Sequence, residues 1–401
     1  MQNKTLLPSL TKKIALKCLA FLVFVSCYNS LNAATHTVCA LGCDFTTIQA
    51  AIDAAAANDI IDIQDANHTE GHITVSQSVT IQGQGKNVTT VSSSYNTASS
   101  GHGNPASAWI ITAPGTTVHI KDMTLDATGI DTYTALRFQD GGSVDNVAFN
   151  EIKHSSSPYL GIAIQVQDGH VDITNCTFTN IGRIGVHFRA GVIDPATISG
   201  TFTNNTYTGK GDGDWLDYAL DISGDVTVTI TGNTITGNTG EASSDGSTSA
   251  GILITTYFPA GENLPNDITI TSNTITGNTV GVSIGFDPAA DVSVATINNN
   301  DLSNNPSGGI VNVSPSATVD GSMNWWGDAS GPSGEGSGTG ASVSPNVTFG
   351  SWATSLAQLG LNPSMPIPTL SEWSLIILAL SLMTLGVLYI TDEKNKLQWN
   401  N

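Results

Sequence analysis

Short runs that alternate between hydrophobic and polar residues recur between residues 115 and 325. Each run begins and ends on an apolar residue with four residues between them, and its fourth position is in turn Met123, Val147, Cys176, Asn205, Asn233, Asn273 and Asn300. Successive fourth positions are 24, 29, 29, 28, 40 and 27 residues apart. This near-constant period predicts a solenoid, in which each repeat stacks only on its neighbours.

The repeats have the composition of β-strands. They are rich in Thr, Ile and Val with a period of two, and Gly or Asn interrupts them every few residues, which excludes helical repeats. Asn occupies the fourth position in four successive repeats, so stacking places these side chains about 4.8 Å apart. At that distance each amide can donate to the next oxygen, and we expect a structural ladder rather than ligands. Cys176 lies in the same column and is expected to be a buried filler.

A second strand is predicted in each repeat. Its apolar positions alternate and are expected to point into the core, as in the pairs Leu136/Phe138, Ile164/Val166, Val186/Phe188 and Leu220/Ile222. The residues between them form one outward column of Arg137, Gln165, His187, Asp221, Leu253 and Ser283, and a neighbouring column of Gln139, Gln167, Arg189, Ser223 and Thr255. We expect these columns to be the most polar exposed strip of the molecule.

Both ends of the stack need covers, because an open solenoid end exposes core and strand edges. Thr46 to Gln49 has the pattern of a capping box, and the sequence predicts a short amphipathic helix from Ile48 to Ala55. At the other end, Met323 to Asp328 and Asn346 to Trp352 are expected to form the last coil.

These end segments carry a family resemblance. The stretches Asp44 to Asp53 and Ser78 to Gln84 resemble the cap and first coil of pectate-lyase-like proteins, and the segment after Met323 resembles the last coil of exported bacterial β-helices. The resemblance covers residues 36 to 353 and implies an all-β fold, a right-handed parallel β-helix solenoid with an N-terminal capping helix. It does not specify an activity, because that fold hosts lyases, hydrolases, adhesins and proteins without known activity.

The first 34 residues have the pattern of an export signal. Four lysines precede an apolar run from Leu19 to Val25, and small residues at Ala33 and Ala34 suit cleavage. A lipoprotein signal with lipidation at Cys27 is the alternative interpretation.

The C-terminal segment has the pattern of a membrane anchor. Ser374 to Ile390 is uncharged and apolar, which predicts one transmembrane helix, with a buried core helix as the alternative. Lys394 and Lys396 follow it, so the positive-inside rule places the tail in the cytoplasm. We therefore divide the chain into a signal peptide (1–34), a β-helix domain with its cap (35–353), a linker (354–366) and a C-terminal sorting region (367–401).

The residues just before the apolar segment are the motif Pro368, Thr369, Leu370, Ser371, Glu372 and Trp373, preceded by Ile367. This motif resembles the IPTL-CTERM protein-sorting domain of Gram-negative bacteria. The resemblance implies export and sorting to the cell surface or outer envelope, with a membrane transpeptidase of the exosortase kind as partner and transient anchoring in the inner membrane.

The charge excludes one class of partner. The chain has 13 Lys+Arg against 33 Asp+Glu, a formal charge of -20. Between residues 35 and 365 the basic residues are scattered, so no nucleic-acid surface is expected. From Asp212 to Glu393 there is no Lys or Arg, so binding of an anionic glycan is expected in the first half. The basic residues of the β-helix and linker are Lys86, Lys121, Arg137, Lys153, Arg183, Arg189 and Lys210.

Candidate catalytic residues lie on the outward columns. His187 and Asp221 are expected one coil apart, close enough for the carboxylate to orient the imidazole and raise its pKa. Arg137 and Arg189 are expected to flank them and to hold a uronate carboxylate.

A second candidate is the loop from Gly211 to Asp217. Trp215 offers a stacking platform for a sugar, and Asp212, Asp214 and Asp217 are expected either to cap a turn, to hold Ca²⁺, or to join Asp221 in hydrolysis, which needs two carboxylates.

Two further features remain. Cys39 and Cys43 can form a small disulfide beside the cap in an oxidising compartment. Gly101 to Gly103 resembles a short polygalacturonase motif, but it precedes the repeats and its companion motifs are absent, so we assign it no role.

Three functions are consistent with these observations. The first is a surface-sorted adhesin, matrix component or glycan-binding module without turnover. The second is a polysaccharide lyase or hydrolase that uses the strip around His187 and Asp221. The third is a structural surface protein stabilised by Ca²⁺.

Overall fold

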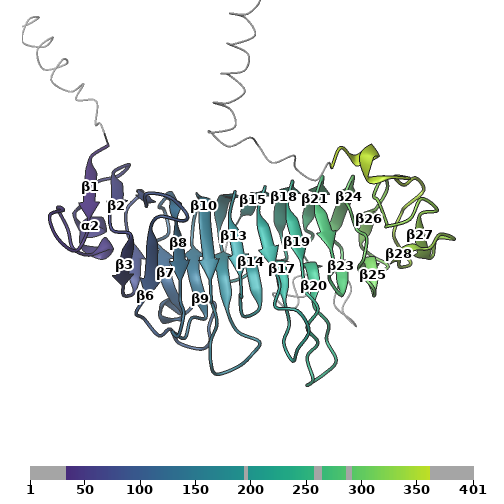
Figure 1. Cartoon of the computed structure of the whole chain (residues 1–401), viewed down its shortest axis with the longest axis horizontal. Coiled ribbons are helices and arrows are strands. Elements are labelled where there is room, and N and C mark those ends of the chain that lie inside the picture. The colour runs from purple at the N-terminus through teal and green to yellow at the C-terminus, as the bar shows by residue number, and fades with distance from the viewer. Residues whose placement is uncertain (1–32, 194–196, 257–263, 286–290, 362–401) are drawn as a thin grey trace, which may run out of the picture.

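The computed structural model describes residues 33–193, 197–256, 264–285 and 291–361. Within these ranges the chain winds into a parallel β-helix, whose strands lie side by side in chain order along the long axis (Figure 1). A typical coil runs from β12 (Gly169–Thr174) through β13 (Thr177–Thr179) to β14 (Ile184–Arg189). The period in the sequence is therefore one turn of a β-solenoid, as predicted.

The described strands form two sheets. The first is a 17-stranded sheet of β1 (Thr35–Val38), β2 (Ile60–Ile63), β3 (Asn67–Glu70), β5 (Thr80–Gln82), β6 (Thr90–Ser93), β8 (Val118–Asp126), β10 (Gly142–Asn150), β12, β13, β15 (Ile198–Thr203), β16 (Thr206–Thr208), β18 (Val226–Thr231), β19 (Thr234–Thr236), β21 (Asp267–Thr271), β22 (Thr274–Thr276), β24 (Val294–Asn298) and β26 (Thr318–Asp320). The second is an 11-stranded sheet of β4 (Ile73–Val75), β7 (Ala108–Thr112), β9 (Thr134–Phe138), β11 (Ile162–Val166), β14, β17 (Tyr218–Ser223), β20 (Ala250–Thr255), β23 (Val280–Ile284), β25 (Gly308–Asn312), β27 (Pro332–Gly334) and β28 (Gly340–Val343).

The bend inside each coil has a local cause in the sequence. The residue before each ladder position has a positive φ, for example 55° at Asn175 and 56° at Asn204. Asn, Asp and Gly tolerate this left-handed conformation best, which explains why they recur there. The bend turns the next side chain inward, so Asn205 and Asn233 are 1% exposed.

The predicted asparagine ladder is present. Asn233 Oδ1 accepts from the Asn205 backbone at 2.8 Å and from its amide at 3.2 Å, and Asn273 Oδ1 accepts from Asn233 in the same way. The ladder continues through Asn300 to Asn324, and Cys176 fills the column before it as a buried free thiol. A second ladder, which we did not predict, joins Asn238, Asn278 and Asn305.

The N-terminal cap differs from its prediction by one residue. The helix α2 spans Ile48–Ala54, and its N-cap is Thr47, whose hydroxyl accepts from Ala50 N at 3.2 Å. The side chain of Gln49 does not close a capping box; it exchanges hydrogen bonds with the backbone of Thr74 in β4. Glu70 accepts from Ile48 N at 2.6 Å instead, so a strand of the first coil satisfies the end of the helix.

The remaining short helices are η1 (Pro105–Ser107) and η2 (Leu356–Leu359). No helix within the described residues is long and apolar enough to cross a membrane. The predicted transmembrane segment, the sorting motif at 367–373 and residues 1–32 of the predicted signal lie outside the described ranges.

Candidate functional site

The outward column predicted on the second sheet has the expected register. Across β9, β11, β14 and β17, Arg137 pairs with Gln165, Gln165 with His187, and His187 with Asp221. The column continues through Leu253 in β20. These residues are neighbours because the strands pair in register from coil to coil, although the loops between the bend and this strand differ in length.

The column is not an exposed strip, and this part of the prediction is wrong. Arg137 is 0% exposed, His187 3% and Asp221 8%. The loop of residues 94–107, which joins β6 to β7, folds back over this face. Arg137 holds that loop, since it donates to the Asn104 carbonyl at 2.8 Å and to Ser107 Oγ at 2.8 Å.

Arg137 therefore does not have the predicted role of a uronate clamp. Its Nε donates to Gln165 Oε1 at 3.0 Å, so all its described bonds go to protein groups. Burial lowers the pKa of Arg137 to about 10, which leaves the guanidinium charged at neutral pH. Arg137 is a positioning residue for the covering loop.

The same loop brings His102 to the column. His102 Nδ1 lies 2.6 Å from Gln165 Nε2, and its Nε2 lies 3.2 Å from the Tyr133 hydroxyl. The Gln165 amide donates to Nδ1, so Nε2 carries the proton of a neutral ring. Burial lowers the pKa of His102 to about 3, and the nearby His187 and Arg189 contribute.

A small cavity of about 220 Å³ lies between the loops and the second sheet. Its polar walls come from His102, Tyr133, Arg183, His187, Arg189 and Asp221. Arg183 Nε and His187 Nδ1 are buried and have no hydrogen-bond partner among the described residues. Buried polar atoms are usually paired, so unpaired ones beside a cavity indicate a place where a ligand can bind.

His187 and Asp221 are neighbours, but the electrostatic prediction for His187 is wrong. His187 Nε2 lies 3.9 Å from Asp221 Oδ2, while Ser223 Oγ donates to Asp221 Oδ1 at 2.9 Å. Burial, with Arg189 and Arg183 nearby, holds the pKa of His187 well below its ordinary value. Burial raises the pKa of Asp221, and Arg183 opposes that rise. The desolvation of both groups outweighs their attraction.

In the loop between β16 and β17, two of the three acids bind other groups of the protein. Asp217 is 0% exposed and makes an ion pair of 3.3 Å with Lys210. Asp214 accepts from Ser243 Oγ at 2.7 Å and from the Tyr159 hydroxyl, whereas Asp212 is exposed. No group of three His, Cys, Asp or Glu residues in the described part of the chain could hold a metal ion. These carboxylates bind protein donors instead, and calcium binding itself stays a prediction.

Trp215 lies outside the small cavity. Its indole donates to the Gly211 carbonyl at 3.1 Å, and Lys210 Nζ lies 5.6 Å from the ring centroid. It borders a different and larger cavity.

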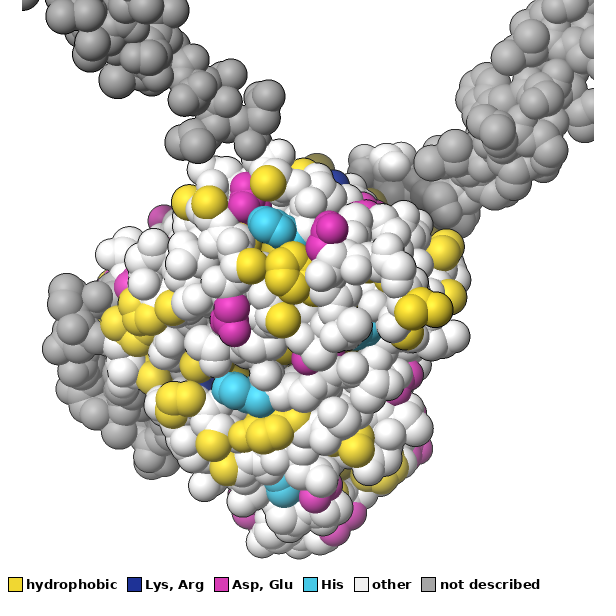
Figure 2. Space-filling view, turned by 90° about the vertical axis from the view of Figure 1, so that its left-hand side faces the viewer, with side chains coloured by type: hydrophobic (Ala, Val, Ile, Leu, Met, Phe, Trp, Pro, Cys, Tyr) yellow, Lys and Arg dark blue, Asp and Glu magenta, His cyan; other side chains and the backbone are white. Residues whose placement is uncertain are grey.

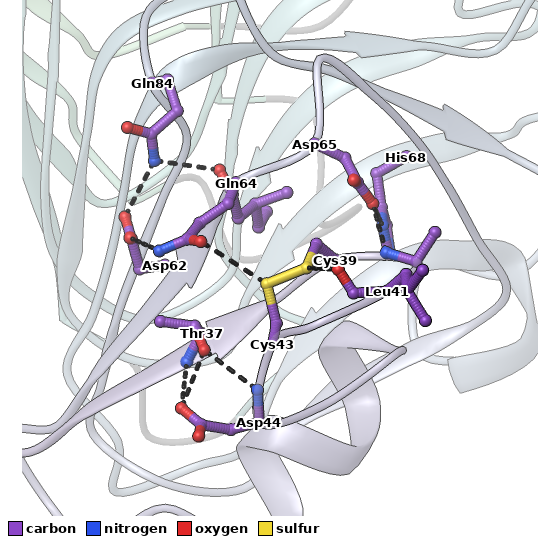
Figure 3. The surroundings of a disulfide bond; sticks show 12 residues. Thr37, Cys39, Leu41, Cys43, Asp44, Asp62, Gln64, Asp65, His68 and Gln84 are labelled. Atoms are coloured by element: carbon purple, nitrogen blue, oxygen red, sulfur yellow. Dashed lines mark hydrogen bonds and ion pairs between the residues drawn. A yellow bond between two sulfur atoms is a disulfide. The ribbon is translucent and has the colours of Figure 1, made fainter.

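The cap carries the predicted disulfide, between Cys39 and Cys43 (Figure 3). Beside it, Thr37 and Asp44 exchange three hydrogen bonds of 2.8 to 3.0 Å. The end-on view of the cap shows acidic side chains spread over a surface that is mostly uncharged, with almost no Lys or Arg (Figure 2). The cap therefore offers no concentrated charge.

The sequence did not identify His102, Tyr133 and Arg183 as site residues. His102 stands in the motif that we set aside, and its position before the repeats hides the fact that its loop folds back onto them. Arg183 precedes β14 by one residue. A signal did exist for Arg183, because it belongs to the few basic residues of an acidic chain.

Comparison with known proteins supports the fold. Residues 139–323 match the family described as right-handed beta helix region, and residues 365–388 match the IPTL-CTERM motif. No curated protein matches the chain.

Solved structures are similar only distantly. A pectin methylesterase variant in complex with a hexasaccharide is 14% identical, with 66% of this chain and 89% of that one covered and a TM-score of 0.37. ORF18 of Geobacillus virus E2 is 12% identical over 75% and 61% of the two chains, with a TM-score of 0.32. The A-module of the mannuronan C-5 epimerase AlgE6 of Azotobacter vinelandii is 14% identical over 77% and 94%, with a TM-score of 0.31.

Proposed function

This chain is a right-handed parallel β-helix protein with a C-terminal IPTL-CTERM motif, and we propose that it is a cell-surface module that binds an acidic glycan without converting it. The observation that carries the proposal is the small cavity, which Arg183 and Arg189 line together with a single carboxylate, that of Asp221. Three of the seven basic residues between positions 35 and 365 gather at this site when Arg137 is included.

The charge balance of the cavity favours an anion. His187 and His102 are neutral at physiological pH because their pKa values are lowered. Two guanidinium groups and one carboxyl group therefore line the cavity. Guanidinium groups bind carboxylates through paired hydrogen bonds, which suits the acid group of a uronic sugar.

The size of the cavity favours binding of one sugar unit. Ligand pockets usually measure about 300 to 1,000 Å³, so 220 Å³ suits a chain end or a side branch better than the middle of a polymer.

The chemistry of the cavity argues against turnover. Hydrolysis needs two carboxylates, and Asp221 is the one carboxylate among the described residues that line the cavity. A lyase needs a base whose pKa lies near the working pH, whereas the pKa of His187 lies well below its ordinary value.

A polysaccharide lyase is the second candidate. Its support is the arrangement of His187 beside Arg189 and Arg183, which could remove a proton next to a carboxylate that the arginines neutralise. A bound anion would also raise the pKa of His187.

The cellular location of the protein is part of the proposal. The export signal at 1–34, the transmembrane helix at Ser374–Ile390 and recognition of residues 368–373 by an exosortase-type transpeptidase would carry the β-helix to the outside of the cell. The match to the IPTL-CTERM motif supports this route.

The test is titration calorimetry of the full chain with glucuronate, galacturonate and glucose. We expect binding of a uronate and not of glucose, and loss of binding in Arg183→Gln but not in Lys121→Gln, a charge removal on β8 away from the cavity. A parallel incubation with uronic polysaccharides, followed by gel filtration, measures turnover. If the chain shortens the polymer and His187→Ala does not, the protein is a lyase and not a binding module. Absence of uronate binding would refute the proposed module.

A further inference from the structure

A larger cavity of about 670 Å³ lies beside the small one. Its walls come from the loops that follow β8, β10, β13 and β16, so four successive coils contribute to it. At about 4.8 Å per coil, such a cavity extends along the solenoid axis. It therefore runs in a direction along which an extended chain of sugars could lie.

The charged groups of this cavity are balanced within the protein. Lys153 pairs with Glu151 at 3.2 Å, and Asp131 accepts from the backbone and hydroxyl of Ser155 at 2.7 and 2.9 Å. Lys210 donates to two carbonyls and pairs with Asp217. The two acids and two lysines that line the cavity thus leave no net charge, unlike the arginines of the small cavity.

The apolar part of the wall includes Trp215, which is partly exposed, together with Ile130, Pro158 and Leu160. Its ring packs closely against two glycines that leave room for it, because a Cβ at Gly213 or at Gly240 would come within 2.3 Å of ring atoms. A partly exposed, amphipathic aromatic ring in a cavity without net charge is suited to the apolar face of a neutral sugar.

The two cavities share a wall. Leu160 lines both of them, in the loop of residues 151–161 between β10 and β11. The neighbouring Tyr159 lines the small cavity and donates to Asp214, one residue before Trp215. One loop therefore positions the cationic site and the aromatic site relative to each other.

We propose that the larger cavity binds a neutral sugar on Trp215, so that the ligand is an acidic heteropolysaccharide in which neutral units accompany a uronic one. This inference rests on the proposed function, since the uronic unit occupies the small cavity. It extends that function by naming the class of glycan.

The experiment is titration calorimetry of the full chain with three kinds of probe. These are glucuronate alone, the neutral oligosaccharide cellotetraose, and mixed oligosaccharides from hyaluronan, unsulfated chondroitin and glucuronoxylan. We expect at least one mixed oligosaccharide to bind about tenfold more tightly than glucuronate. Trp215→Phe keeps an aromatic ring in the packed position but removes part of the stacking face, and it should weaken that binding about fivefold.

The controls separate the two proposals. Trp215→Phe should leave the affinity for glucuronate unchanged, and the matched variant Trp325→Phe, at a partly exposed tryptophan outside both cavities, should change neither affinity. If glucuronate binds but no mixed probe binds more tightly, or if Trp215→Phe behaves like Trp325→Phe, this inference is overturned and the proposed function stands. Binding of cellotetraose that depends on Trp215, without any binding of glucuronate, would support the neutral-sugar cavity and overturn the proposed function.

Discussion

His187 Nε2 and Asp221 Oδ2 lie 3.9 Å apart on adjacent strands, yet the two groups do not form a charged pair that stabilises the imidazolium. Burial and two arginines keep His187 neutral. The same burial raises the pKa of Asp221. The separation of two neighbouring groups is therefore a poor guide to their charge when both are removed from water.

The first prediction concerns acid stability. The folded pKa values of His187 and His102 lie below the unfolded value of about 6.5, so their contribution to stability is present above pH 6.5 and is lost as the pH falls through the folded values. Each group should lower the free energy of unfolding by about 1.4 kcal/mol per pH unit in that range. Urea unfolding between pH 7 and pH 4 measures this slope.

The variant His187→Gln removes one of the two titrating rings. The slope of its free energy of unfolding against pH should therefore be smaller by the contribution of one group. His119→Gln is the matched control, because His119 is exposed and does not line the small cavity. An unchanged slope in His187→Gln would show that this ring is not kept neutral by the fold.

The second prediction concerns the ion pair of Lys210 with Asp217. Lys210→Met leaves a buried carboxylate without its partner, and breaking a buried pair usually costs about 3 to 5 kcal/mol. Chemical denaturation of the variant and of the parent chain measures the loss. Lys153→Met is the control, because its pair with Glu151 is 40% and 38% exposed and should contribute less than about 1 kcal/mol. Equal losses in both variants would contradict the prediction.

The third prediction concerns the ladder. Asn233→Ala removes donors to Asn273 Oδ1 and the Phe202 carbonyl, and it removes the acceptor of Asn205. Buried polar groups left unpaired cost about 1 to 3 kcal/mol each, so we expect a loss of at least about 3 kcal/mol. Thr234 is the next residue and is exposed, so Thr234→Ala should lower the free energy of unfolding by less than about 0.5 kcal/mol. Thermal unfolding compares the two, and similar melting temperatures would argue against a structural ladder.

The fourth prediction concerns the loop that covers the second sheet. Arg137→Met removes three hydrogen bonds, two of which hold residues 104 and 107. We expect faster proteolytic cleavage within residues 94–107, because the loop loses its attachment to β9. Lys121→Met, on β8 of the first sheet, should not change the cleavage rate. Cleavage at the parental rate in Arg137→Met would show that other contacts hold the loop.

The sequence by itself determined the solenoid, the inward positions of Leu136 and Phe138, the column from Arg137 to Asp221 and the ladder through Asn233. Each of these follows from a local pattern that recurs in successive coils, since residues in the same place of successive coils must meet. The disulfide between Cys39 and Cys43 also follows from closeness in the chain.

Only the tertiary structure decided what the column does. His102 is 85 residues from its neighbour His187 in the sequence, and no repeat brings the loop of residues 94–107 onto the second sheet. That loop holds Arg137 through Asn104 and Ser107 and places the ring of His102 beside that of His187. Lys210 likewise donates to the Ile181 and Gly182 carbonyls in the loop after β13, and Trp215 lines the larger cavity together with the loop after β10. Burial depends on how segments distant in sequence pack together, so the chemistry of this surface could not be derived from the repeat alone.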